Sequence, residues 1–61
     1  MQKKIKVLLI EDDYTAASQV AQYLESVGFE LDISETAVDG LLKLSAQHYD
    51  ILLLDLSLPD F

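Results

Sequence analysis

Residues 50–60 read DILLLDLSLPD, an apolar run enclosed by aspartates and followed by a loop that contains proline. The aliphatic residues between the aspartates predict a strand over residues 50–55 that is covered on both faces, as strands of parallel sheets are. Pro59 bars a continuing strand because proline has no N–H group to donate to a sheet. Asp55 is therefore expected at the carboxyl end of a buried strand.

Residues 5–10, IKVLLI, show the same nearly continuous apolar character and predict another strand that is buried on both faces. Three consecutive acids, Glu11-Asp12-Asp13, follow this strand directly. Residues 30–34, ELDIS, alternate polar and apolar side chains instead. Such alternation is typical of a short edge strand with one partly solvated face.

Two amphipathic helices are predicted between these strands. In residues 14–27 apolar side chains recur at intervals of three and four, with Asp13 placed as the N-cap and Gly28 as the left-handed residue beyond the end. A second helical stripe follows Thr36, whose hydroxyl is expected to cap it, and ends near residue 48. Gly40 within that stripe is expected to permit close packing against a neighbouring element.

The element order β-α-β-α-β predicts an α/β fold, and right-handed crossovers leave the strand orders 1-2-3 and 2-1-3 to choose between. The order 2-1-3 places the helices on opposite faces and makes the two continuous apolar strands neighbours, so we favour it. Glu11, Asp12 and Asp55 then meet at the carboxyl ends of adjacent strands. Ligands bind open α/β sheets at this point.

Carboxylates that meet in this way repel one another unless a cation lies between them. Mg²⁺ fits such a site because it takes one or two carboxylates, accepts other oxygen ligands and keeps several waters. An aspartate beside the ion can also attack phosphorus and form an acyl phosphate. The alternative is that these acids only solvate strand ends or start a turn, and for Asp13 we favour the role of helix cap.

The composition restricts the other classes of function. The 61 residues contain no cysteine and carry a formal net charge of −7, so we expect neither a disulfide framework nor direct binding to nucleic acid. The unbroken aliphatic runs are too short to cross a membrane or to form a signal peptide, and we therefore expect a cytoplasmic location. The acidic first loop, which lacks glycine, argues against a nucleotide site.

The stretches VLLIEDD (residues 7–13) and DILLLDLSLPD (residues 50–60) together resemble the receiver domain of two-component response regulators. An acidic pair after the first strand is weak evidence alone, but the pair followed by an apolar strand that reads D-L-x-L-P-D is highly specific. The resemblance covers residues 1–61 but only half of that domain. It implies a truncated flavodoxin-like fold, with the first three strands, in the order 2-1-3, and the first two helices, one on each face.

By this resemblance, Asp55 is the aspartate that accepts a phosphoryl group from a histidine kinase. Glu11 and Asp12 match the acidic pair that holds Mg²⁺ with Asp55, and the main-chain carbonyl of Ser57 completes the site. The implied function is phosphorelay signal transduction by a phosphoprotein connected with transcription regulation. Receivers of this family catalyse their own phosphoryl transfer and slow dephosphorylation, but the later switch residues are missing from this half. We therefore do not expect it to be an enzyme.

An alternative function is that of a chemically silent receiver fragment that acts as a self-associating structural module. In the complete family fold the third strand is interior, so here one of its edges is expected to be bare and ready to pair with another chain. The simplest product is a homodimer with two-fold symmetry. Labelling of Asp55 by a small phosphodonor in the presence of Mg²⁺ separates the two functions.

Overall fold

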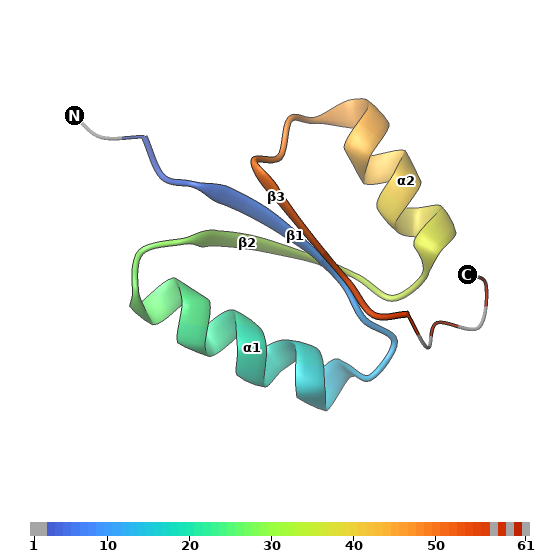
Figure 1. Ribbon diagram of the computed structural model, residues 1–61, viewed down its shortest axis with the longest axis horizontal. Coiled ribbons are helices and arrows are strands. Elements are labelled where there is room, and N and C mark those ends of the chain that lie inside the picture. The colour runs from blue at the N-terminus through green and yellow to red at the C-terminus, as the bar shows by residue number, and fades with distance from the viewer. Residues whose placement is uncertain (1–2, 57, 59, 61) are drawn as a thin grey trace.

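The computed structural model describes residues 3–56, 58 and 60. Figure 1 shows the chain alternating between strands and helices, as predicted. The elements, within the described residues, are β1 (Lys6–Ile10), α1 (Tyr14–Ser26), β2 (Glu30–Ser34), α2 (Ala37–Ala46) and β3 (Ile51–Leu54). Residues 30–34 form a strand with the predicted bounds, and the other elements are shorter than predicted by one or two residues at an end.

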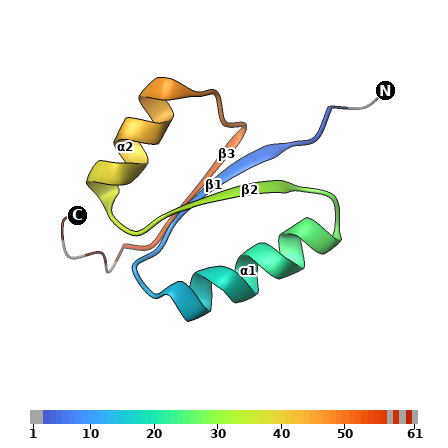
Figure 2. The ribbon, with the colours of Figure 1, turned by 180° about the vertical axis from the view of Figure 1, so that it is seen from behind.

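The described strands form one parallel sheet in the order β2-β1-β3, which confirms the predicted topology. Ile10, the last residue of β1, pairs with Ser34 of β2 on one side and with Leu54 of β3 on the other. Helices α1 and α2 cover opposite faces of the sheet (Figures 1 and 2). The two crossovers therefore leave the carboxyl ends of β1 and β3 next to each other.

Strand β1 is the centre of the core, and its residues 7–10 are all buried. Leu8, which is fully buried, clusters with Ile10 and with Leu58 from the segment after β3. Side chains alternate between the faces of a strand, so Val7 and Leu9 face the side that α1 covers, where Ala17 and Ala21 are buried.

Helix α2 approaches the sheet closely because Gly40 has no side chain. A Cβ atom built on Gly40 would overlap the Ile10 side chain, which confirms the predicted close packing. Lys43 of the same helix reaches the end of β2, where its Nζ donates to the Ile33 carbonyl oxygen (2.8 Å) and to the buried Ser34 Oγ (3.0 Å). These contacts hold α2 over β1 and β2.

The prediction that residues 50–55 form a strand covered on both faces is wrong for the described chain. Ile51 and Leu52 are 39% and 45% exposed, and Leu53 and Leu54 are only half-buried. The reason is the position of β3 at the edge of the sheet, while the helices pack on β1 and β2. Among the described strands only β1 is interior. The apolar side chains of β3 are therefore less covered by the described residues than the sequence pattern predicts.

The predicted helix caps are confirmed. Asp13 Oδ1 accepts hydrogen bonds from the amides of Thr15 (3.0 Å) and Ala16 (3.2 Å) at the start of α1, and Gly28 has a φ of 103° just beyond its end. Thr36 Oγ1 accepts from the Asp39 amide (3.0 Å) at the start of α2. Neither described helix is long and apolar enough to cross a membrane.

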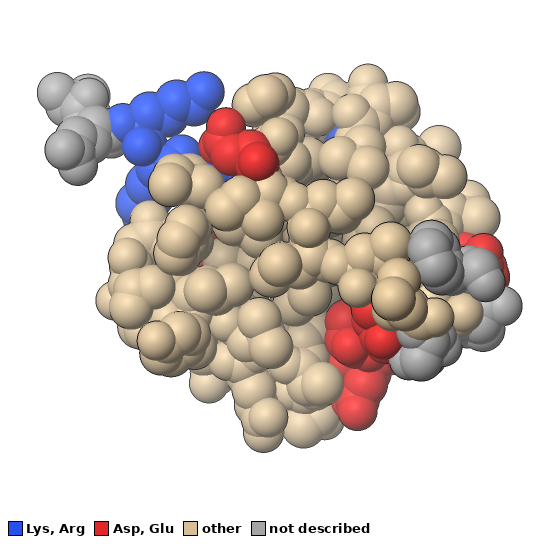
Figure 3. Space-filling model, in the orientation of Figure 1, with Lys and Arg blue, Asp and Glu red and all other residues tan. Residues whose placement is uncertain are grey.

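A polar cluster extends from the amino-terminal edge of the sheet, where β1 begins, to Asp32 in the middle of β2. The Tyr49 hydroxyl donates to Asp32 Oδ2 (2.6 Å), and Lys6 Nζ lies 5.2 Å from the centre of the Tyr49 ring. Figure 3 shows lysine side chains at this edge. Desolvation and the bond to Asp32 raise the pKa of Tyr49 to about 12.

We expect this cluster to make the fold sensitive to alkali. Because the pKa of Tyr49 is higher in the folded chain than the value of about 10 in an unfolded one, its contribution to stability is present below pH 10 and is lost as the pH rises toward 12. Tyr49→Phe should flatten that part of the curve of unfolding free energy against pH. Urea denaturation across this range measures it, and identical curves would contradict the assignment.

Candidate functional site

The register of the sheet brings the chain just after β1 beside the chain just after β3. Because Ile10 pairs with Leu54, the next residues, Glu11 and Asp55, emerge next to each other. The Asp55 amide donates to the Ile10 carbonyl oxygen (3.0 Å), and the Glu11 amide donates to the Ser34 carbonyl oxygen (2.9 Å). The backbone at both acids is thus fixed by the sheet.

Three carboxylates meet at this point, as the sequence predicts. One carboxylate oxygen from each of Glu11, Asp12 and Asp55 lies within 4.8 Å of the others. Glu11 and Asp55 are half-buried and Asp12 is exposed. Acidic side chains gather near the carboxyl-terminal edge of the sheet in Figure 3. Ser57, whose main-chain carbonyl the family resemblance adds to the site, lies outside the described residues, as does Pro59.

The neighbouring Asp13 has a different role, because its carboxylate caps α1. Its amide donates to Glu11 Oε1 (3.1 Å) and lowers the pKa of Glu11. Desolvation and the adjacent carboxyls of Asp55 and Asp12 act in the other direction, and the balance leaves the pKa of Glu11 raised. The carboxylates therefore destabilise one another's charged forms, and a cation among them would relieve this repulsion.

The donor set fits a hard divalent cation. Glu11, Asp12 and Asp55 offer only carboxylate oxygens, which are the ligands that Mg²⁺ prefers, and the group contains no soft or imidazole ligand. Mg²⁺ binds through few protein ligands and retains waters, so the exposed side of the cluster at Asp12 suits it. These three residues would hold the ion.

The structure adds one contact that we did not predict from the sequence. Asp60, at the end of the D-L-x-L-P-D motif, accepts hydrogen bonds from the amides of Ala37 and Val38 at the start of α2, each at 2.9 Å. An aspartate after a proline signals only a turn in the sequence. The contact could have been anticipated only from the topology, which brings the segment after β3 and the start of α2 to the same edge of the sheet.

Comparison with known proteins agrees with this geometry. The model of the family described as "Response regulator receiver domain" matches residues 7–61. The transcriptional regulatory protein CrdR of Helicobacter pylori is 37% identical over 60 residues, which cover 98% of this chain and 27% of that protein. The cell cycle transcriptional regulator CtrA of Caulobacter vibrioides is 39% identical over 56 residues, or 92% of this chain and 24% of that protein.

A relative of another kind is the sensor protein EvgS of Escherichia coli, which is 31% identical over 58 residues, or 95% of this chain and 5% of that protein. The chain therefore spans about a quarter of the regulators and a much smaller share of the sensor. No solved structure matches. Receiver domains of response regulators take part in phosphorelay signalling. The family model matches most of the chain, and the strand order and the acidic cluster agree with what the family resemblance implies. This chain therefore belongs to the response regulator receiver domain family.

Proposed function

We propose that this chain is the phosphoacceptor half of a receiver, in which Asp55 takes a phosphoryl group from a histidine kinase in the presence of Mg²⁺. The observation that carries the proposal is the meeting of Glu11, Asp12 and Asp55 at the ends of β1 and β3, with carboxylate oxygens within 4.8 Å of one another. Membership of the receiver family supports it.

The chemistry of such a transfer is nucleophilic. A carboxylate oxygen of Asp55 forms a bond to phosphorus as the P–N bond of a phosphohistidine breaks, the leaving imidazole nitrogen takes up a proton, and an acyl phosphate results. Mg²⁺, when bound, would neutralise charge on the phosphoryl oxygens. The protein contributes by positioning the acidic residues. The Asp55 amide donates a hydrogen bond to the Ile10 carbonyl oxygen, and the Asp13 amide donates one to the Glu11 carboxylate.

The proposal is tested by incubating the chain with acetyl phosphate with and without Mg²⁺. Intact-mass spectrometry should show one added phosphoryl group only when Mg²⁺ is present, and hydroxylamine should remove it because acyl phosphates react with that nucleophile. The same mass in both samples would contradict the proposal. Asp39→Gln serves as a matched control, because Asp39 is an acid of α2 whose carboxylate bonds to Lys43 (2.8 Å) instead.

The proposal also covers the role of the chain in the transfer and its location in the cell. The chain would promote only its own modification, so we propose that it is a phosphorylated protein and not an enzyme that turns over a separate substrate. We place it in the cytoplasm as part of a longer regulator of transcription, since two of the relatives are named as transcriptional regulators. With a net charge of −7, any contact with nucleic acid would belong to another part of that regulator.

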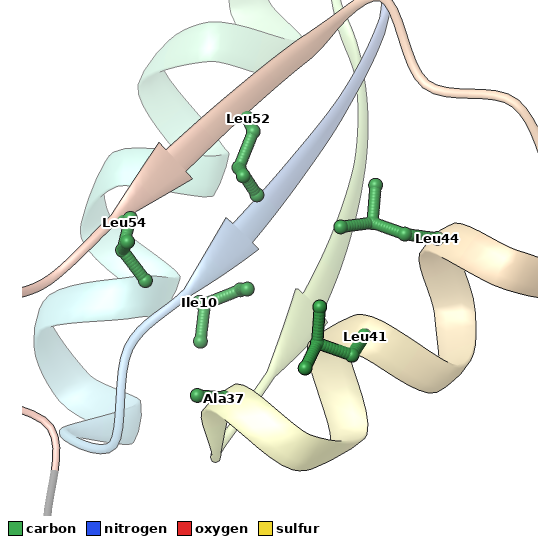
Figure 4. Close-up of a pocket in the computed structure, with 6 residues that line it drawn as sticks. All are labelled: Ile10, Ala37, Leu41, Leu44, Leu52 and Leu54. Carbon is green, nitrogen blue, oxygen red and sulfur yellow. The ribbon is translucent and has the colours of Figure 1, made fainter. Parts of the chain in front are cut away.

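The second candidate function, self-association as a structural module, is favoured by the exposed side of β3. Strand β3 lies at the edge of the described sheet, and an open apolar pocket of about 120 Å³ separates it from α2 (Figure 4). The pocket is lined by Ile10, Ala37, Leu41, Leu44, Leu52 and Leu54. An edge strand beside bare apolar surface is a template for pairing with another chain.

We expect a homodimer in which the β3 edges of two copies pair antiparallel about a two-fold axis. Light scattering coupled to size exclusion should give twice the mass of the chain at tens of micromolar. Leu52→Lys should shift the population toward monomer, because a charge on an edge strand opposes pairing. Gln22→Lys, which adds the same charge to the exposed surface of α1, is the control. A well-folded monomer of the unmodified chain would refute the association.

A further inference from the structure

Asp60, which comes after Asp55 in the sequence, contacts the start of helix α2. Asp60 Oδ1 accepts a hydrogen bond from the Ala37 amide, and Asp60 Oδ2 accepts one from the Val38 amide, both at 2.9 Å. The first amides of a helix have no partner within it, and a negative charge there is favoured by the helix dipole. The two bonds hold the pKa of the Asp60 carboxyl below its usual range.

Helix α2 also has a cap of its own, independent of Asp60. Thr36 Oγ1 accepts from the Asp39 amide at 3.0 Å, and Thr36 directly precedes the helix. The hydrogen bonds that Asp60 accepts therefore do more than cap the start of α2. They tie residues that are 22 and 23 positions apart in the chain.

Two described residues that precede Asp60, Asp55 and Leu58, are also held in place. The Asp55 amide donates to the Ile10 carbonyl oxygen at 3.0 Å, and Leu58, which is 4% exposed, lies in the core cluster with Leu8 and Ile10. Asp55 is thus anchored on β1, Leu58 in the core and Asp60 on α2. Without the Asp60 anchor, Asp55 would be held less firmly at the end of β3, where its carboxylate must stay beside Glu11.

We infer that Asp60 is a positioning residue for the phosphoacceptor, which it helps to keep beside Glu11 and Asp12 through its own attachment to the start of α2. Asp60 is not among the three carboxylates of the cluster, so it acts through the backbone. Its importance for the reaction rests on the proposed function of Asp55. A small displacement of a reacting group is enough to slow a reaction strongly.

The test compares the complete chain with Asp60→Ala, Asp60→Asn and Thr36→Ala. Thr36→Ala is the matched control, because it removes the cap that α2 has next to it in the chain and leaves the bonds of Asp60 in place. Hydrogen exchange measured by NMR reports the Asp55 amide, which bonds to Ile10. The Glu30 amide, which bonds to the Ile5 carbonyl oxygen at 2.9 Å near the opposite edge, is the internal reference.

In Asp60→Ala, exchange at Asp55 should rise about fivefold relative to Glu30, as expected for the loss of a capping contact. The affinity for Mg²⁺, titrated on the same sample, should fall about tenfold, which is typical when a partner that orients a ligand is removed. Asp60→Asn keeps one acceptor oxygen and should restore part of both. Thr36→Ala should change neither the exchange ratio nor the affinity.

The inference is overturned if Asp60→Ala and Thr36→Ala behave alike, with Asp55 and Glu30 exchanging faster together. Asp60 would then be only a second helix cap. If the unmodified chain shows no response to Mg²⁺ while Asp60→Ala still accelerates exchange selectively at Asp55, the positioning role stands and the proposed metal-dependent function fails. Should Asp60→Ala not fold, Asp60→Asn gives the same comparison with an almost unchanged side-chain shape.

Discussion

Asp55→Asn should abolish Mg²⁺-dependent labelling by acetyl phosphate. The amide that replaces the carboxylate has almost the same shape but is a far weaker nucleophile, so the acyl phosphate cannot form. The bond from the residue 55 amide to the Ile10 carbonyl oxygen belongs to the backbone and is kept. The substitution also removes a carboxyl that raises the pKa of Glu11, so repulsion within the cluster should decrease. Intact-mass spectrometry measures the labelling.

Two variants show whether this loss is specific. Asp13→Asn changes an acid next to the cluster whose carboxylate caps α1, and asparagine caps helices about as well as aspartate. Its labelling should match that of the unmodified chain. Asp12→Asn removes a metal ligand and not the nucleophile, so labelling should persist but require more Mg²⁺. Labelling that survives Asp55→Asn would assign the nucleophile to another residue.

The acidic cluster was predictable because its geometry follows from the sheet. The continuous apolar character of β1 and β3, with right-handed crossovers, favours their adjacency, and Glu11 and Asp55 each stand directly after one of these strands. The distances and the raised pKa of Glu11 needed the structure, because they depend on side-chain conformation and solvent exposure at the strand ends.

Two features were beyond the sequence pattern. An apolar run such as 51–54 predicts that a strand is covered, but the pattern does not say what covers it, and Leu52 remains 45% exposed in the described chain. The bonds of Asp60 to Ala37 and Val38 join two segments that become neighbours only through the tertiary fold. A local sequence pattern indicates whether a residue is buried, but it does not identify a contact partner that is distant in the sequence.

The second large effect is expected on stability. Leu8 is 0% exposed and belongs to the cluster formed with Ile10 and Leu58 beneath α2. Leu8→Ala should cost about 2–5 kcal/mol, since truncating a buried leucine loses its transfer free energy and leaves a cavity. A chain of this size has a total unfolding free energy of roughly 3–9 kcal/mol. The Leu8→Ala protein should therefore lose a large share of its unfolding free energy, which urea denaturation followed by far-UV circular dichroism measures.

Leu52→Ala is the matched control, because Leu52 pairs with Leu8 in the register of the sheet but is 45% exposed. In a monomer it should cost about 1 kcal/mol. Equal losses for the two variants at low concentration would contradict the burial difference between β1 and β3. If β3 is covered by a second copy, the loss from Leu52→Ala should instead grow with protein concentration, because association stabilises only the folded chain that presents this surface. The concentration dependence of the losses from Leu8→Ala and Leu52→Ala therefore distinguishes a core that one chain completes alone from a core that a second chain completes.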